Sequence, residues 1–168
     1  MTTKEKLLAL LEDSKGTFFS GEEIARTLQV SRAAVWKAVN ALREDGYTVD
    51  AATNKGYRLS PDSDILSPQG IRRFLKPEYR DLDLTVLPTA PSTNALVREK
   101  ANQGRPEGCI IIACEQTDGR GRYGRQFFSP VDSGVYLSLL LRPTAYSPQQ
   151  ATCLTAAAAA ASSRFFRA

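Results

Sequence analysis

Three helix-like patterns followed by two short β-prone runs fill the first 60 residues, and this order constrains the fold more than any other feature. Apolar residues recur at helical spacing over residues 4–13. Ser20 and Glu23 have the spacing of a capping box, which predicts a second helix from that point to about Leu28. The first two helices of a small helical unit are therefore expected here.

A third helix and a hairpin complete this pattern. The helix is predicted from Ser31, its N-cap, to Gly46, with a buried stripe formed by Val35, Val39 and Leu42. Two runs, YTVDA and GYRLS, flank a polar turn, which is typical of a β-hairpin. Three short helices and a hairpin predict a winged helix-turn-helix over residues 1–60, followed by a linker at residues 61–68.

The predicted third helix is the candidate for entering the DNA major groove, because the second helix of a helix-turn-helix brings its N-terminal residues to base edges. For Trp36, packing against the hairpin or a neighbouring helix is favoured over base contact. Cations of the hairpin are equally compatible with solvated charge, and many winged helices contact proteins instead of DNA. The candidate DNA contacts are Ser31, Arg32, Trp36, Lys37, Asn40, Lys55 and Arg58.

Charge and residue content exclude several classes of site. The formal net charge of +4 is spread along the chain, so a nucleic-acid site must arise from local placement of Lys and Arg. No histidine is present, which excludes Ser-His-Asp and Cys-His catalysis and histidine metal sites. Cys109, Cys114 and Cys153 lack Cys-x-x-Cys spacing and are predicted to be buried thiols. Without a long apolar run or a signal-peptide pattern, the sequence predicts a cytoplasmic protein with no membrane association.

Beyond residue 68 the pattern changes to interleaved strands and helices. A short helix is predicted at residues 70–75, a longer one from Ser92 to about Asn102, and an alanine-rich one from Pro148. Residues 69–168 therefore predict an α+β domain with a mixed or antiparallel sheet. Its strands are predicted at residues 82–86, 109–116 and 134–143.

Seven residues between two predicted strands, Gly119–Arg125 (GRGRYGR), give the sharpest chemical signal in the chain. Three glycines permit left-handed backbone and close approach of amide groups to an anion. Three arginines offer bidentate donors to phosphate or carboxylate. We therefore expect this arginine-glycine loop to become ordered around a nucleotide phosphate. A disordered RNA-binding segment and a solvated loop are the alternatives.

The residues around this loop resemble the signature of biotin–protein ligases. The resemblance covers EQTDGRGRYGRQFFSP, the following GVYLSLLLRP, and PSTNALVREKA upstream. The segments SRAAVWKAVNALREDGY and NKGYRLS are similar to the winged helix of the family's bifunctional members, which also repress biotin operons. The similarity extends to about residue 157. It implies a winged helix followed by a class II synthetase-like catalytic domain, with helices on a mixed sheet.

The resemblance implies a role for each residue that matches a family motif. Hydrogen bonding to the biotin head group is implied for Ser92, Thr93, Asn94 and Gln116, although Ser92 is equally suited to cap a helix. Phe127 stands where the family often has tryptophan near adenine, and it keeps a stacking face without the indole N–H. The three loop arginines are the candidate catalytic residues, which would stabilise developing charge. Closure over biotin and the adenylate phosphate is implied for Gly119, Arg120, Gly121, Arg122, Gly124 and Arg125.

The implied reaction has two steps. Biotin and ATP, with Mg²⁺, would form biotinyl-5′-AMP. A lysine of the biotin carboxyl carrier protein, a subunit of acetyl-CoA carboxylase, would then take the biotinyl group. The adenylate would also act as corepressor, by favouring a homodimer whose two winged helices bind operator DNA.

One motif of the family has no counterpart in the sequence, a Lys-Trp-Pro-Asn-Asp segment that carries an essential lysine. The family's further strands and SH3-like domain also lack counterparts, and the final SSRFFRA fits the family poorly. We therefore expect a truncated chain that ligates biotin very slowly. The alternatives are a DNA-binding regulator with a non-functional ligase remnant and a ligase for lipoate or octanoate, against which the GRGRYGR pattern argues.

Overall fold

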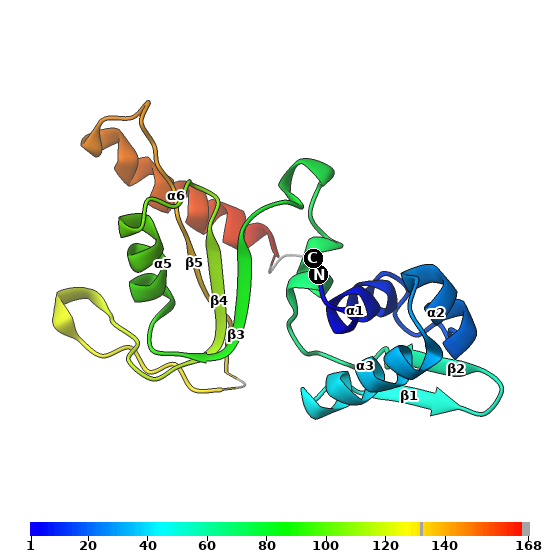
Figure 1. Ribbon diagram of the computed structural model, residues 1–168. Coiled ribbons are helices and arrows are strands. Elements are labelled where there is room, and N and C mark those ends of the chain that lie inside the picture. The colour runs from blue at the N-terminus through cyan, green and yellow to red at the C-terminus, as the bar shows by residue number, and fades with distance from the viewer. Residues whose placement is uncertain (132, 166–168) are drawn as a thin grey trace. The chain divides into compact units, whose positions relative to one another are not determined.

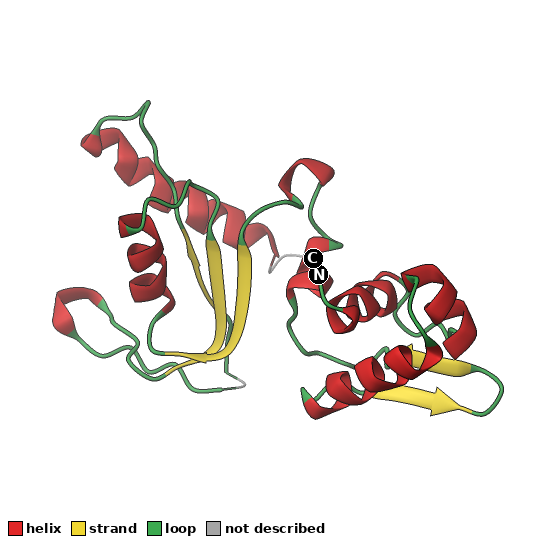
Figure 2. Ribbon diagram, in the orientation of Figure 1, coloured by secondary structure: helices red, strands yellow, loops and turns green. Residues whose placement is uncertain are grey.

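The computed structural model describes residues 1–131 and 133–165, without the side chains of residues 122, 148, 149 and 162–165. The chain divides into two units, Met1–Val86 and Leu87–Ala168 (Figure 1). The chain contains helices and two small sheets and has an α+β fold, as the sequence predicts (Figure 2). None of the described helices is both long and apolar enough to cross a membrane.

The N-terminal unit contains the predicted three helices and hairpin. Side-chain oxygens of Thr2, Ser20 and Ser31 cap the three helices, and the Ser20–Glu23 capping box is confirmed. A second capping box, between Thr2 and Glu5, was not predicted. The elements are α1 (Thr3–Asp13), α2 (Gly21–Leu28), α3 (Arg32–Glu44), β1 (Val49–Ala52) and β2 (Gly56–Leu59).

One apolar core holds this unit together. The predicted stripe of α3 is buried in it, beside Leu7 and Leu11 of α1 and Ile24 of α2. Such burial is the main source of stability for short helices, because an isolated helix of this length is marginal in water. The hairpin is antiparallel, with Val49 opposite Leu59. It is joined to the segment before α2 by paired backbone hydrogen bonds between Phe19 and Tyr57.

Helix α4 (Pro68–Arg72) packs on α1 through a small polar cluster. Ser67 caps α4 and donates a hydrogen bond to the carboxylate of Glu12, which is only 5% exposed. Arg73 donates to the carbonyl oxygen of Glu12, and its Nη1 lies 3.9 Å from the Glu12 carboxylate. A 3₁₀ turn, η1 (Pro77–Tyr79), follows. The predicted function of residues 61–68 as a linker stays a prediction.

The second unit is built on a three-stranded sheet in the order β3-β4-β5. Strands β4 and β5 are antiparallel, and Ile111 lies opposite Ser138. Helix α5 covers one face of the sheet, where Val97 packs with Ile111 and Leu140. Leu137 and Leu139, which flank Ser138 on β5, are exposed. The elements are β3 (Leu84–Ala90), α5 (Thr93–Asn102), β4 (Ile110–Gln116), η2 (Arg122–Gly124), β5 (Tyr136–Leu139) and α6 (Pro148–Phe165).

The prediction of three buried thiols is correct only for Cys109, which lies in the core beneath α5. Cys114 is half-buried near the end of β4. Cys153 is exposed, because it lies on α6, where most of the described side chains face solvent. Residue type alone favoured burial of Cys153, but α6 holds it on an exposed surface.

Candidate DNA interface and ligand site

The first half of α3 presents a polar surface because its buried stripe faces the core. Arg32 and Lys37 are exposed and Asn40 is half-buried. Ser31 is the helix N-cap, and its hydroxyl accepts from the N–H of Ala34 at 3.2 Å. Arg32 thus lies with the free backbone donors at the N-terminal end of α3, where phosphates are commonly bound, and Lys37 and Asn40 lie further along the helix.

Trp36 is 58% exposed and lines a groove of about 730 Å³ between α3 and the hairpin. Arg32, Ser20 and Asn54 also line this groove. The sequence favoured packing of the indole against the hairpin or a neighbouring helix. The indole thus lies beside the hairpin, and more than half of its surface is also accessible to a bound partner.

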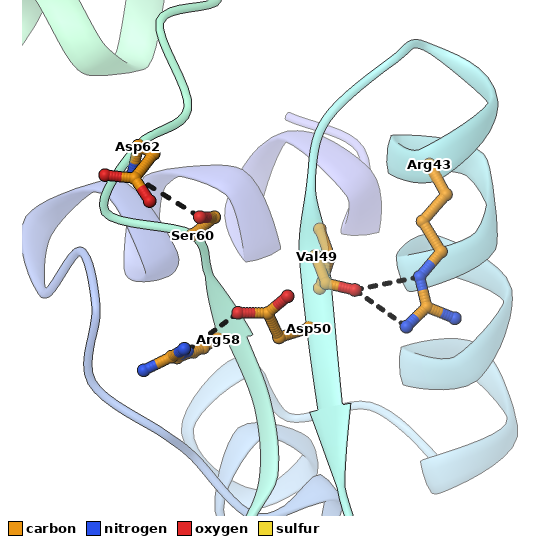
Figure 3. Close-up of polar contacts among 6 residues, drawn as sticks. All are labelled: Arg43, Val49, Asp50, Arg58, Ser60 and Asp62. Atoms are coloured by element: carbon orange, nitrogen blue, oxygen red, sulfur yellow. Dashed lines mark hydrogen bonds and ion pairs between the residues drawn. The ribbon is translucent and has the colours of Figure 1, made fainter.

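The two candidate cations of the hairpin differ in their surroundings. Nε of Arg58 donates to Oδ2 of Asp50 at 2.8 Å (Figure 3), and its guanidinium carbon lies 4.7 Å from the centroid of the Phe18 ring. Lys55 lies at the exposed turn, with its Nζ 6.0 Å from the same ring. Lys55 is therefore the more accessible of the two positive charges.

Arg43 connects α3 to the hairpin, a role that sequence reasoning missed. Its Nε and Nη2 both donate to the carbonyl oxygen of Val49, at 3.0 and 2.7 Å (Figure 3). Its position in the last turn was the available signal, since arginines there often bind nearby carbonyl groups.

In the second unit, Thr93 and Gln116 come together where α5 begins and β4 ends. Oε1 of Gln116 accepts from the backbone N–H of Thr93 at 2.8 Å and from its hydroxyl at 3.2 Å. Thr93 is 3% exposed. Ser92 is buried, and its hydroxyl caps α5 by accepting from Ala95, while Asn94 is exposed. Two of the four residues predicted for the head group thus share one polar cluster.

Two serines that the sequence did not single out belong to the same cluster. The hydroxyl oxygens of Ser138 and Thr93 are 2.9 Å apart. Nε2 of Gln116 donates to Ser129 at 3.2 Å. The alternation of β5 was the available signal for Ser138, because every second residue of a strand shares a face. Ser129 carried no such signal, since it is brought close only by the return of the loop.

The arginine-glycine loop forms a finger that is paired at its base. The N–H of Phe127 donates to the Gly119 carbonyl, and the N–H of Gly121 donates to the Arg125 carbonyl, both at 2.8 Å. At the tip, Tyr123 and Gly124 have positive φ angles of 59° and 73°. Of the three glycines, Gly124 alone has the left-handed backbone that the sequence permits, and the non-glycine residue Tyr123 has it as well. Ordering around a phosphate stays a prediction.

The candidate ligand-binding side chains of the finger are largely exposed. Arg120 forms an exposed ion pair with Asp118, at 2.9 Å, and Arg125 is also exposed. The side chain of Arg122 lies outside the described residues. Phe127 is 53% exposed and meets the ring of Tyr136 edge to face, with ring centroids 6.5 Å apart. One aromatic face next to exposed guanidinium groups is suited to a nucleotide.

Two features define the class of this protein. The first unit is a helix-turn-helix with an exposed polar helix, and in the second unit a polar cluster adjoins an arginine-glycine finger. Residues 3–58 match the HTH domain family, and residues 86–166 match the biotin/lipoate A/B protein ligase family. The chain thus combines an HTH domain with a domain of the biotin/lipoate A/B protein ligase family.

Curated relatives carry the same combination of names. The chain is 40% identical over 142 residues to the bifunctional ligase/repressor BirA of Bacillus subtilis (strain 168), which covers 84% of this chain and 44% of the relative. It is 37% identical over 141 residues to BirA of Escherichia coli (strain K12), with 84% and 42% covered. The chain therefore resembles the bifunctional ligase/repressors and spans less than half of their length.

Proposed function

We propose that this protein is a biotin–protein ligase that also represses transcription of biotin genes. It would form biotinyl-5′-AMP from biotin and ATP. It would then transfer the biotinyl group to a lysine of the biotin carboxyl carrier protein of acetyl-CoA carboxylase, in the cytoplasm. The observation that carries the proposal is the contact of Gln116 with Thr93, beside a finger that carries three arginines. Both parts lie within the segment that matches the ligase family.

The polar cluster is suited to the biotin head group by its chemistry. A ureido ring offers N–H donors next to a carbonyl acceptor, and a buried site matched to them rejects analogues that lack them. Thr93, Gln116 and the backbone near Gly119 would bind this ring, with Ser92 holding the start of α5. Asn94, whose side chain is exposed at the first turn of α5, would join them.

The finger is suited to the adenylate. Arg120, Arg122 and Arg125 would bind phosphate oxygens and stabilise the charge that develops as pyrophosphate leaves. Gly119, Gly121 and Gly124 would let the backbone approach the ligand, and Phe127 would stack on adenine. Mg²⁺ would accompany ATP through the phosphates themselves. Among the residues that the structure describes, no cluster of three or more acidic or cysteine side chains is placed to hold a metal ion.

The N-terminal unit would bind operator DNA through Ser31, Arg32, Trp36, Lys37 and Asn40 of α3, with Lys55 at the hairpin. Arg58 would contribute less, because Asp50 and Phe18 already surround its guanidinium. Biotinyl-5′-AMP would act as corepressor by promoting a homodimer that presents two such helices to paired half-sites.

Calorimetry with the whole chain tests the ligand part of the proposal. Biotinyl-5′-AMP is titrated beside lipoyl-5′-AMP, and binding of the first alone is expected. Arg125→Ala should weaken this binding, whereas Arg98→Ala, an exposed arginine of α5, should not. Preferential binding of lipoyl-5′-AMP would favour a lipoate or octanoate ligase.

A gel-shift experiment with operator DNA tests the second part and the alternative function. Addition of biotinyl-5′-AMP is expected to increase the fraction of shifted DNA. A shift that does not respond to the adenylate, together with absence of heat in calorimetry, would favour a DNA-binding regulator whose ligase remnant has no ligand.

A further inference from the structure

A chain of hydrogen bonds runs through the polar cluster from β5 to the base of the finger. It begins at Ser138, passes through Thr93 and Gln116, continues to Ser129 and ends at the carbonyl oxygen of Phe127. The successive donor–acceptor distances are 2.9, 3.2, 3.2 and 3.1 Å. Every link lies within hydrogen-bond range.

The end of the chain at the finger determines its direction. The Ser129 hydroxyl donates to the Phe127 carbonyl, because a carbonyl oxygen only accepts. The Ser129 oxygen is then left with lone pairs, so the Gln116 atom that faces it must be a donor. This assigns the amide nitrogen to the Ser129 side and the amide oxygen to the opposite side.

The other end requires the same assignment. The backbone N–H of Thr93 only donates, and it lies 2.8 Å from Oε1 of Gln116. The Thr93 hydroxyl must also point its proton at Oε1, since two oxygen lone pairs would otherwise face each other across 3.2 Å. The Thr93 oxygen therefore accepts from Ser138. Both ends independently fix one orientation of the Gln116 amide.

The donors and acceptors that remain define what the cluster offers a ligand. Both lone pairs of Oε1 are used by Thr93, and one hydrogen of Nε2 is used by Ser129. Gln116 has one further N–H, and the Thr93 oxygen has one further lone pair. We infer that Ser129 and Ser138 are positioning residues that make Gln116 present a donor, and Thr93 an acceptor, to a bound cyclic urea.

This inference rests on the proposed function, because it deepens the description of the same site. A cyclic urea presents a carbonyl acceptor beside an N–H donor, which is the complement of the pair that the chain leaves available. Burial strengthens the preference for this one orientation of the Gln116 amide, since Thr93 is 3% and Ser129 is 2% exposed. Water therefore has little access to compensate for a reversed amide, which would mismatch both ends.

The experiment compares the affinities of biotin and protonated 2-iminobiotin, measured by calorimetry on the whole chain. The guanidinium of 2-iminobiotin replaces the carbonyl acceptor by donors, so the wild-type chain should prefer biotin. Gln116→Glu has the same shape but offers only acceptors. It should bind biotin at least about tenfold more weakly and shift the preference toward 2-iminobiotin. Unchanged biotin affinity would overturn the inference, because Gln116 would then present its oxygen.

The two serines are tested by the same ratio of affinities. Ser129→Ala and Ser138→Ala should each lower biotin affinity about three- to tenfold and reduce the preference for biotin. Ser138→Thr keeps the hydroxyl and should restore both. Ser133→Ala is the matched control, because that serine bonds the Pro130 carbonyl outside the chain. Wild-type ratios in both alanine variants would overturn the inference.

The ratio of the biotin and 2-iminobiotin affinities separates a loss of positioning from a loss of stability, since both ligands bind the same folded fraction of the chain. A variant that only lost stability would bind both ligands proportionally more weakly. If the wild-type chain binds neither biotin nor biotinyl-5′-AMP, the proposed function fails and the orientation of Gln116 is not at fault. Binding of biotin with unaltered ratios in the serine variants refutes the positioning role alone.

Discussion

Nε of Arg58 donates a hydrogen bond to Oδ2 of Asp50 directly across the two strands of the hairpin. The two residues are register partners, so the ion pair stabilises the hairpin as cross-strand pairs commonly do. The guanidinium carbon of Arg58 also lies 4.7 Å from the centroid of the Phe18 ring. Arg58 thereby acts first as a structural residue, and Lys55 remains the accessible cation at the turn.

This difference predicts separate effects for the two cations. Lys55→Ala should weaken binding to DNA of any sequence and reduce the slope of log affinity against log salt by about 1, because one phosphate contact is lost. Lys6→Ala, which removes an exposed lysine of α1, is the control. Arg58→Ala should mainly lower the free energy of unfolding, by up to about 1 kcal/mol, because both side chains of the ion pair are only partly buried. Titrations at several salt concentrations check the first result, and an unchanged slope for Lys55→Ala would contradict it.

The hairpin also depends on a glycine. Gly56 has a φ of +95°, and a Cβ at this position would lie 2.0 Å from the Phe19 carbonyl oxygen. Gly56→Ala should therefore destabilise the N-terminal unit by at least about 2 kcal/mol, through backbone strain and loss of the Phe19–Tyr57 pairing. Gly21→Ala, where the nearest atom is 3.7 Å away, is the control. Urea unfolding measures both, and equal midpoints would show that the turn adapts.

Local features of the fold could be predicted from the sequence, because they depend on neighbouring residues. Caps at Ser20 and Ser31 and the stripe of α3 follow from spacing alone, and the structure has them. Contacts between distant residues could not be predicted. Arg43 on the Val49 carbonyl and Ser129 on Gln116 depend on how a hairpin or a loop returns.

The candidate ligand site shows the same limit. A resemblance singled out Thr93 and Gln116, and the structure brings them together through two part-buried hydrogen bonds. The resemblance could not predict that Asn94, the third residue of the same motif, is exposed at the first turn of α5. Sequence motifs identify which residues belong to a site, whereas the direction of each side chain depends on tertiary packing.

Tyr47 makes the N-terminal unit less stable at high pH. Burial raises the pKa of Tyr47 above its ordinary value of 10.0, against the opposing effect of its hydrogen bond with Ser67. The folded state therefore keeps the phenolic proton to a higher pH than the unfolded state does. This contribution to stability is complete below pH 10 and is lost as the pH rises through the folded-state pKa.

Urea unfolding at pH 9, 10 and 11 measures this dependence. The wild-type chain should lose stability between pH 10 and 11 more steeply than Tyr47→Phe, which has no proton to release there. Tyr79→Phe, at an exposed tyrosine, should retain the wild-type slope. A Tyr47→Phe variant with the same pH profile as the wild type would show that another group is responsible.

The base of the finger requires Gly119 for a steric reason. A Cβ there would lie 2.4 Å from the Phe127 carbonyl oxygen and 2.8 Å from the Ser129 hydroxyl oxygen, so either the finger or the Ser129 link must move. Gly119→Ala should weaken binding of biotinyl-5′-AMP at least about tenfold, because small displacements of pre-positioned groups are costly. Gly134→Ala, with its nearest atom 3.8 Å away, should bind normally. Calorimetry gives both affinities, and hydrogen exchange of the Phe127 amide, which bonds Gly119, reports whether the base has opened. Wild-type affinity with rapid exchange would mean that the paired base of the finger is not needed for the ligand.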